Sequence, residues 1–192
     1  MQKVNIRPAV PNDIGVITRI YADAVLNGTA SFEIEPPDEV EMLRRQTALL
    51  SSGYPYFAAE IENIVAGYAY AGPYRTRPAY DWTIEDSIYV APNMHRKGIG
   101  GLLLARLITE SERRGFRQMI GVIGDSAQIG SIRVHERAGF SHVGTFRSVG
   151  FKHGKWLDTV LMQRALREGD ATAPQHDGAL VNRHPERRAT SR

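Results

Sequence analysis

Cysteine is absent from the 192-residue sequence, and this absence excludes several kinds of chemistry. The chain can form no disulfide framework, offer no thiolate nucleophile and bind no metal through cysteine. The six histidines are scattered, and none falls into a metal-binding spacing such as HExxH. We therefore expect a protein with no bound metal and no cysteine nucleophile.

Long apolar runs are lacking as well. No stretch reaches the roughly 20 apolar residues that a membrane-spanning helix needs, and the first ten residues lack the apolar core of a signal peptide. The net charge is only +3, and the basic residues are not clustered with aromatic residues as they are in a nucleic-acid interface. The sequence therefore predicts a cytoplasmic protein with no membrane and no nucleic acid as partner, and its mild positive charge suits a small anionic ligand.

Apolar residues make up 42% of the chain, enough for one packed domain. Their spacing predicts, in order, a strand, two helices, three strands, a helix, a strand, a helix and two strands. The expected strands are residues 3–9, 56–62, 64–72, 83–92, 117–124 and the two arms of a hairpin over 140–166, with turns near Asn63 and at His153-Gly154. The expected helices run from about Pro11 past Ala24, over 38–50, from Gly98 past Ile108, and over 131–139. This order predicts an α+β domain around one mixed sheet.

The composition changes at about Glu168. Residues 168–192 carry few large apolar side chains and mixed charge, too little to offset the entropy of ordering. We therefore expect one domain over residues 1–167 and a disordered polar tail over residues 168–192.

A basic, glycine-spaced loop, HRKGIGG at residues 95–101, joins the expected strand 83–92 to an apolar helix. Glycine lets the backbone approach a ligand closely, and a helix N-terminus presents unpaired N–H groups and partial positive charge. The loop is not a P-loop, because it lacks GxxxxGK(S/T), and it is not a GxGxxG dinucleotide loop, because Leu103 stands at the last position. We expect a phosphate site of another kind.

The loop resembles the acetyl-CoA loop of the GNAT N-acetyltransferases, whose pattern is Q/R-x-x-G-x-G/A, with His95 as a departure at the first position. The segment SIRVHERAGF looks like the second cofactor segment of these enzymes. The segments at residues 68–90 and 150–163 resemble the phosphinothricin acetyltransferase subgroup, which includes acetyltransferases for methionine sulfone and methionine sulfoximine. The resemblance covers about residues 3–165. It implies a mixed, mostly antiparallel sheet flanked by helices, with a splay at the central strands and acetyl-CoA as co-substrate.

The resemblance also implies roles for single residues. Glu85, in the motif E-x-S-x-Y-V, would be the base that takes the amine proton, although a strand glutamate can also face solvent. His135 stands where many GNAT enzymes place a tyrosine as the acid for the CoA thiolate, and a packed helix histidine fits it about as well. The implied cofactor contacts are Ile88, Tyr89, Val90, Arg96, Lys97, Gly98, Ile99, Gly100, Gly101, Gln128 and Ser131. The implied substrate contacts are Phe32, Arg75, Thr76, Arg77, Glu85, Asp86 and Ser87.

Some of these assignments have alternatives. Gln128 and Ser131 fit a purely structural place at a helix N-terminus nearly as well. Arg75 matches the subgroup's substrate arginine, because its guanidinium suits a carboxylate. Asp86 is a departure from the motif, and the sequence gives it no interpretation.

The combined expectation is an acetyl-CoA-dependent N-acetyltransferase acting on the α-amine of a small amino-acid analogue of the phosphinothricin, methionine sulfone or methionine sulfoximine type. Transfer would be direct in a ternary complex, because no cysteine can carry the acetyl group. Two alternatives stay open: acetylation of another small amine, such as a polyamine or aminoglycoside, and a non-catalytic acyl-CoA binding module. The arginines of the 72–82 loop disfavour the first, and Glu85 beside an intact loop disfavours the second. Relatives are homodimers whose long final hairpin helps form the interface, so the resemblance implies a homodimer.

Overall fold

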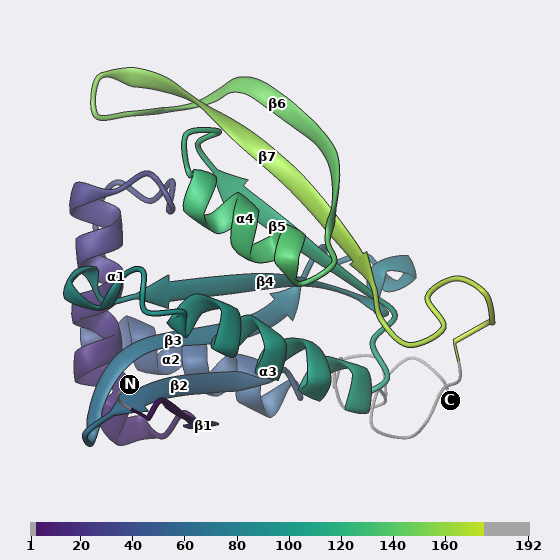
Figure 1. Cartoon of the computed structure of the whole chain (residues 1–192), viewed down its shortest axis with the longest axis horizontal. Coiled ribbons are helices and arrows are strands. Elements are labelled where there is room, and N and C mark those ends of the chain that lie inside the picture. Colours follow the sequence, from purple (N-terminus) through teal and green to yellow (C-terminus); the bar gives the residue numbers. More distant parts are fainter. Residues whose placement is uncertain (1–2, 175–192) are drawn as a thin grey trace, which may run out of the picture.

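The computed structural model describes residues 3–174, and one seven-stranded sheet runs through this part of the chain (Figure 1). The strand order is β1-β2-β3-β4-β5-β7-β6. The strands are β1 (Asn5–Pro8), β2 (Tyr56–Ile61), β3 (Ile64–Pro73), β4 (Thr83–Val90), β5 (Gln118–Gly124), β6 (Ser141–Lys152) and β7 (Lys155–Ala165). Every neighbouring pair is antiparallel except β4 and β5, which are parallel. The predicted mixed, mostly antiparallel sheet is confirmed.

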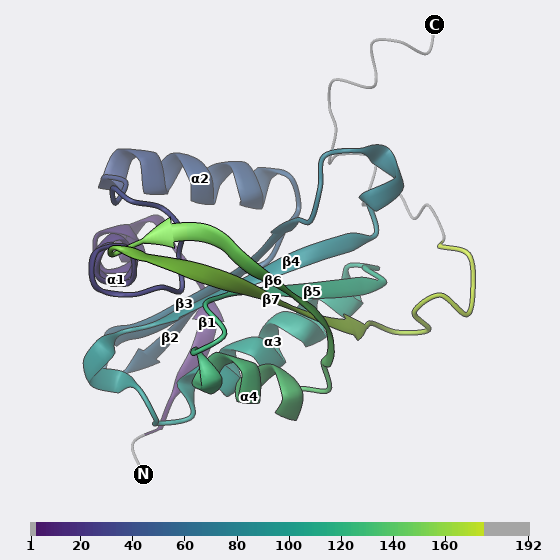
Figure 2. The same cartoon turned by 90° about the horizontal axis from the view of Figure 1, so that it is seen from above.

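Helices cover both faces of the sheet (Figure 2). Helices α1 (Ile14–Asn27) and α2 (Glu39–Ser51) lie on one face, and α3 (Ile99–Arg113) and α4 (Ile129–Arg137) lie on the other. Three short 3-10 turns precede α1, β4 and α3: η1 (Pro11–Asp13), η2 (Pro78–Tyr80) and η3 (Pro92–Met94). The predicted order of helices and strands is confirmed. The 3-10 turns were not predicted, because three residues are too few to show a repeat in the spacing of apolar residues.

Local chemistry explains several of these boundaries. The side chain of Asp38 accepts a hydrogen bond from Glu41 N at 2.8 Å and so caps α2. Both predicted hairpin turns are present, and in each the two central residues have positive φ: 51° and 73° at His153 and Gly154. Two consecutive positive φ values suit the twist of a tight β-hairpin.

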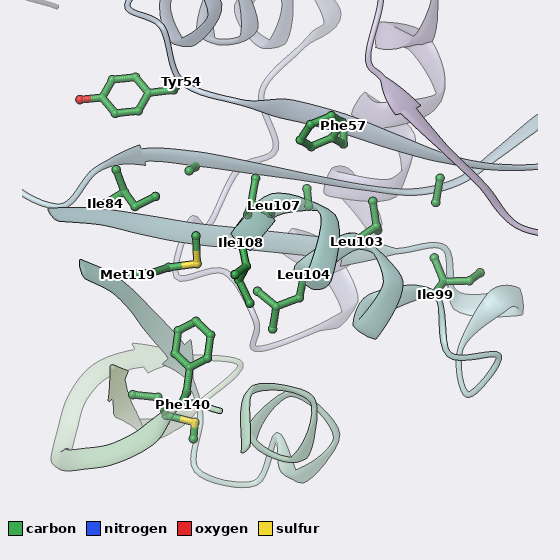
Figure 3. Close-up of a cluster of buried hydrophobic side chains, with 14 of the residues drawn as sticks. Tyr54, Phe57, Ile84, Ile99, Leu103, Leu104, Leu107, Ile108, Met119 and Phe140 are labelled. Atoms are coloured by element: carbon green, nitrogen blue, oxygen red, sulfur yellow. The ribbon is translucent and has the colours of Figure 1, made fainter. Parts of the chain in front are cut away.

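Two apolar layers hold the helices to the sheet. On one face, α3 packs Leu103, Leu104 and Leu107, all fully buried, against Ile84 and Met119 of the central strands (Figure 3). On the other face, α1 and α2 pack against a second buried cluster rich in tyrosine. Burying such side chains contributes about 1.5–3 kcal/mol each to folding. The two layers fix β4 from both sides.

The parallel pair at the centre of the sheet diverges. Pairing of β4 with β5 begins at Thr83–Gln118 and ends at Asp86–Gly121. Beyond that point β4 continues to Val90 along β3, while β5 continues along β7. This is the predicted splay, and it opens a cleft in the middle of the sheet.

The first part of the expected tail packs against the domain. Arg117, which is buried, donates from Nε to the carbonyl of Gly169 at 2.8 Å and from Nη2 to the carbonyl of Thr172 at 3.0 Å. Residues 175–192, the rest of the expected tail, lie outside the described residues. Within residues 3–174, no helix combines the length and the apolarity needed to cross a membrane.

Candidate functional site

A cleft that is open to solvent occupies the splay between β4 and β5. Its lining comes from both diverging strands, from α4 and from the loop after α1: Ala30, Asp86, Ser87, Ile88, Tyr89, Val122, Ile123, Gly124, Gln128, Ser131 and His135. The structure thus brings together expected site residues from two segments that lie about 40 positions apart in the sequence. Among residues 3–174 no group of acidic, histidine or cysteine side chains could hold a metal ion.

Backbone donors of β4 face this cleft. Ala91 N donates to Ala66 O of β3 at 2.9 Å. Because peptide groups point alternately to the two edges of a strand, those of Ile88 and Val90 face the other edge, where pairing with β5 has ended. Their N–H groups can therefore bind a ligand in the splay. His95 donates from Nε2 to Val90 O at 2.9 Å, so the residue that departs from the loop pattern ties the loop to β4.

The loop after β4 ends in an exposed helix N-terminus. The first backbone bond of α3 runs from Leu102 N to Gly98 O at 3.2 Å, so the amides of the three residues between them have no partner within the helix. Gly98 has φ of +80°, a left-handed conformation that favours glycine. The amides and the helix dipole together make this turn a site for a phosphate.

The space in front of this turn is open. A Cβ atom at Gly98 or Gly101 would meet no heavy atom within 4 Å, and one at Gly100 would meet only Val90 Cγ2 at 4.0 Å. The side chains of Arg96 and Lys97 are exposed beside it. These glycines therefore leave an open cradle in front of the turn, which a side chain would narrow. Ile99 is buried under the turn and can contribute only its amide.

Glu85 lies on β4 between Ile84, which packs with α3, and Asp86, which bonds to α4, so strand alternation puts it on the opposite face, where it is half-buried. No hydrogen bond or ion pair with residues 3–174 engages its carboxylate. Burial, aided by the nearby negative charge of Asp86, raises the pKa of Glu85 to about 7, although the positive charge of Arg75 opposes the rise. A carboxylate of this kind is a suitable proton acceptor near neutral pH. A solvent-facing strand glutamate would not have these properties.

Arg75 lies in the exposed loop before β4, with its guanidinium carbon 5.1 Å from the centre of the Tyr74 ring. Thr76 and Arg77 are exposed in the same loop. Arg75 is the arginine whose charge acts on the pKa of Glu85. A guanidinium whose charge reaches Glu85 could also hold an anionic group near that carboxylate.

Phe32 is packed against two glycines that the sequence analysis did not single out, and one of them, Gly124, lines the cleft. A Cβ atom at Gly150 would lie 2.4 Å from its ring, and one at Gly124 would lie 2.9 Å away. The buried Lys152 donates from Nζ to Ser31 O at 2.6 Å, which fixes the same loop. These residues were missed because they lie far from Phe32 in the sequence. The available signal was the presence of glycine in a strand, which often marks a close approach of another part of the chain.

His135 and Asp86 form a buried pair at the cleft floor. His135 Nδ1 lies 2.8 Å from Ser131 O, and its Nε2 lies 3.0 Å from Asp86 Oδ2. Burial acts to lower the pKa of His135, but the bond and charge of Asp86 prevail and raise it. Asp86 thus faces α4, away from Glu85, and the structure does not bring its side chain to the side of the substrate residues.

The remaining expected residues line the cleft in different ways. The ring of Tyr89 packs at 5.0 Å from that of Tyr21 and at 5.2 Å from that of Tyr68, so only its backbone can meet a ligand in the splay. Gln128 occupies the N-cap position of α4 but does not cap it; its Nε2 donates to Thr29 Oγ1 at 3.0 Å. Gln128 therefore ties the start of α4 to the loop between α1 and α2, which is a structural contact but not the helix N-terminal role given as its alternative.

Comparison with known proteins gives a consistent result. Residues 17–140 match the model of the Acetyltransferase (GNAT) family. The sequence is 47% identical over 170 residues to a phosphinothricin N-acetyltransferase of Alcaligenes faecalis, a match that covers 88% of this chain and 86% of that protein. It is 38% identical over 165 residues to an L-methionine sulfoximine/L-methionine sulfone acetyltransferase of Salmonella typhimurium, covering 86% and 96%. The fold matches the crystal structure of a GNAT superfamily phosphinothricin acetyltransferase from Sinorhizobium meliloti in complex with AcCoA, with a TM-score of 0.88, 47% identity and coverage of 90% and 94%.

Proposed function

Because the chain belongs to the GNAT acetyltransferase family, we propose that it acetylates the α-amine of a small amino-acid analogue with acetyl-CoA. The favoured substrates are of the phosphinothricin, methionine sulfone or methionine sulfoximine type, on which the relatives act by name. One observation carries the proposal. Glu85 lies on β4, the strand that leads to the phosphate cradle, and its carboxylate has no partner within residues 3–174. Its pKa is raised to about 7, and the positive charge of Arg75 acts on it.

The chain's own residues fit acetyl-CoA. The first turn of α3 would hold the pyrophosphate, and the free amides of Ile88 and Val90 would face the arm that follows it. When bound, acetyl-CoA supplies the acetyl group as a thioester. An amide donor in the splay can also stabilise the negative charge that develops on the thioester oxygen.

Two side chains would prepare the amine. Arg75 would bind the carboxylate of the amino acid and so orient its α-amine toward Glu85. Glu85 would accept the proton that the amine must lose, directly or through a water. His135 lies across β4 from Glu85, bonded to Asp86, and the acid role that the sequence resemblance implies for it stays a prediction. Since cysteine is absent from the chain, the transfer is assigned as direct, within one complex of both substrates.

We also infer a cytoplasmic homodimer. The hairpin β6–β7 exposes large apolar side chains, each more than half exposed: Val143, Phe146, Val149, Phe151 and Trp156. Large apolar side chains gathered on one exposed hairpin favour a protein interface there. A second copy of the chain is the partner that the sequence resemblance implies. The cytoplasmic location stays a prediction from the sequence.

An amine panel tests the proposal, with release of the free thiol of CoA as the readout. Amino-acid analogues with a free α-amine and a free carboxylate should be acetylated, and their carboxamides should react far more slowly. Preferred use of a polyamine or an aminoglycoside would contradict the proposed substrate class. Calorimetric binding of CoA without turnover of any amine would favour a binding module.

A further inference from the structure

One buried acidic residue has no part in the mechanism above. The side chain of Asp86 is only 2% exposed, deeper than that of Glu85 beside it. Successive residues of a strand face opposite sides of the sheet. Asp86 therefore lies on the face of α4, while Glu85 lies on the face of α1 and α2.

Hydrogen-bond chemistry restricts the proton positions on His135. Its Nδ1 lies 2.8 Å from Ser131 O, and a carbonyl oxygen can only accept, so Nδ1 carries a proton. Its Nε2 lies 3.0 Å from Asp86 Oδ2, and a bond between these atoms requires one further proton. Both ring nitrogens are thus committed to partners within the protein. The ring has no free nitrogen to offer a ligand in the cleft.

The surroundings hold the pair in this arrangement. A Cβ atom at Gly121 would lie 2.9 Å from His135 Cδ2 and 3.5 Å from Asp86 Oδ1, so the pair fits only because this position is glycine. Phe140 packs its ring edge-on at 5.0 Å from the imidazole. Asp86 Oδ1 is buried and has no hydrogen-bond partner among residues 3–174. A carboxylate with one unpaired oxygen keeps its charge at a cost, which the cation of a protonated His135 offsets.

The other charged groups near Asp86 are not placed to act as its counterion, so the protonated His135 takes this role. On β4 the neighbouring group is Glu85, which is acidic and repels it. On α4 the other charged residues, Arg133, Glu136 and Arg137, are exposed. From β7, Arg164 donates to the carbonyl of Ala138 and pairs with Glu112 of α3. On β5 the residue opposite Asp86 is Gly121, which carries no charge.

We propose that Asp86 is a positioning residue that makes His135 a fixed, doubly protonated partner and adds the negative charge that strengthens Glu85 as a base. In this arrangement His135 keeps its proton through the reaction and acts through Asp86, not as a free acid. If it released that proton, a bare Nε2 would face a carboxylate, which is unfavourable. The link to Glu85 rests on the proposed function, whereas the state of His135 does not.

Nitrogen NMR of the full chain labelled at histidine tests the state of His135. Its signals are assigned by their absence from His135→Gln. In the wild type, both ring nitrogens should be protonated at pH 7.5, well above the ordinary histidine pKa of about 6.5. In Asp86→Asn, the carboxamide can donate to Nε2, so the ring should be neutral at pH 7.5 with its proton on Nδ1. Glu136→Gln, which removes an exposed negative charge from the next position of α4, should leave the signals unchanged.

A wild-type ring that is neutral at pH 7.5, or an Asp86→Asn ring as fully protonated as the wild type, would overturn the proposal. If Asp86→Asn does not fold, the wild-type titration alone still decides it. These readouts need no turnover, so they remain informative if no amine in the panel is acetylated and the proposed function fails.

The pH profile of kcat/KM tests the link to Glu85. Loss of the neighbouring charge makes Glu85 easier to ionise, so the acid limb of Asp86→Asn should move from about pH 7 toward lower pH. At pH 6, the variant should retain a larger share of its own plateau activity than the wild type does. If Asp86→Asn is active and the acid limb of its kcat/KM profile does not move, this part of the proposal is wrong.

Discussion

Two adjacent acidic residues show how much one strand position can change a side chain. Glu85 is half-buried and unpaired within residues 3–174, and its pKa rises to about 7. Asp86 is fully buried and bonded to His135. The alternation of β4 puts one carboxylate on the side of α1 and α2 and the other under α4. The chemistry of each then follows from its surroundings and not from its residue type.

At this scale we predict that Glu85→Gln lowers kcat by roughly 10²–10⁴-fold at neutral pH, because the variant keeps the size of the side chain but not its basicity. Activity should recover at high pH, where the amine loses its proton unaided. Steady-state kinetics over a pH series measures both effects. His135→Phe should cost less. Near-wild-type turnover of Glu85→Gln at pH 7 would remove Glu85 as the base.

The same residue makes a prediction about stability. The folded-state pKa of Glu85, about 7, lies above its ordinary value of 4.5, so ionisation of Glu85 opposes folding. Its stabilising contribution is complete below pH 4.5 and is lost as the pH rises through 7. Thermal unfolding should therefore show that Glu85→Gln gains Tm relative to the wild type at pH 8 but not at pH 4. An equal change at both pH values would contradict the raised pKa.

Arg75 supplies a test of substrate binding. Arg75→Ala should raise the KM for the amino acid roughly tenfold while the KM for acetyl-CoA changes little, because a charge-assisted bond to the carboxylate is lost. Arg77→Ala, an exposed arginine of the same loop, is the matched control and should have a smaller effect. If the wild type acetylates amino acids and their amides equally well, no cation binds the carboxylate of the substrate.

At the scale of elements, the first turn of α3 and its middle turns have different surroundings. Its middle turns bury leucines against the sheet, while its first turn leaves three amides without partners in the helix. The glycines of that turn are not required by its own packing, because open space lies beyond Gly100 and Gly101. The fold therefore does not require glycine at these two positions, and we propose that their lack of a side chain serves the ligand.

Gly100→Ala tests this division. Gly100 is helical, so alanine should leave stability unchanged or raise it by up to about 1 kcal/mol. The added methyl group enters the cradle, so calorimetry should show weaker binding of CoA. Gly144→Ala, at a strand position that is equally open, should leave CoA affinity unchanged. Unchanged affinity in Gly100→Ala would show that the anion binds elsewhere.

At the scale of the whole molecule, the hairpin β6–β7 forms one edge of the sheet (Figure 1) and exposes large apolar side chains. Trp156 is 65% exposed and packs only edge-on against Phe151, at 5.3 Å. Such an aromatic pair at a protein surface is typical of the anchor of an interface. The same hairpin carries Lys152, which holds the loop of Phe32.

Light scattering tests the dimer. The wild type should have twice the mass of one chain, and Trp156→Ser should shift the population toward the monomer because the central apolar contact is lost. Ile64→Ser is the control: Ile64 is 60% exposed but lies in the β2–β3 hairpin, far from β6 in the order of the sheet. A wild type with the mass of one chain would remove the homodimer.

Local features of the sequence determined the elements and the likeness to the family. The period of apolar residues gave the order of strands and helices, and glycine with basic residues before an apolar helix gave the phosphate loop. These signals are readable because each depends on residues a few positions apart. Glu85 could be singled out for the same reason, since its motif is contiguous.

Only the tertiary structure decided what the buried groups do. Asp86 and His135 lie 49 positions apart, and their bond exists because the splay, α4 and Gly121 bring them together. Lys152 reaches Ser31 across 121 positions in the same way. The pKa of Glu85 depends first on its burial, which its sequence neighbours do not reveal, and then on the charges of the adjacent Asp86 and of Arg75. Burial and long-range pairing are properties of the packed chain, so a sequence pattern can name such residues without giving their partners.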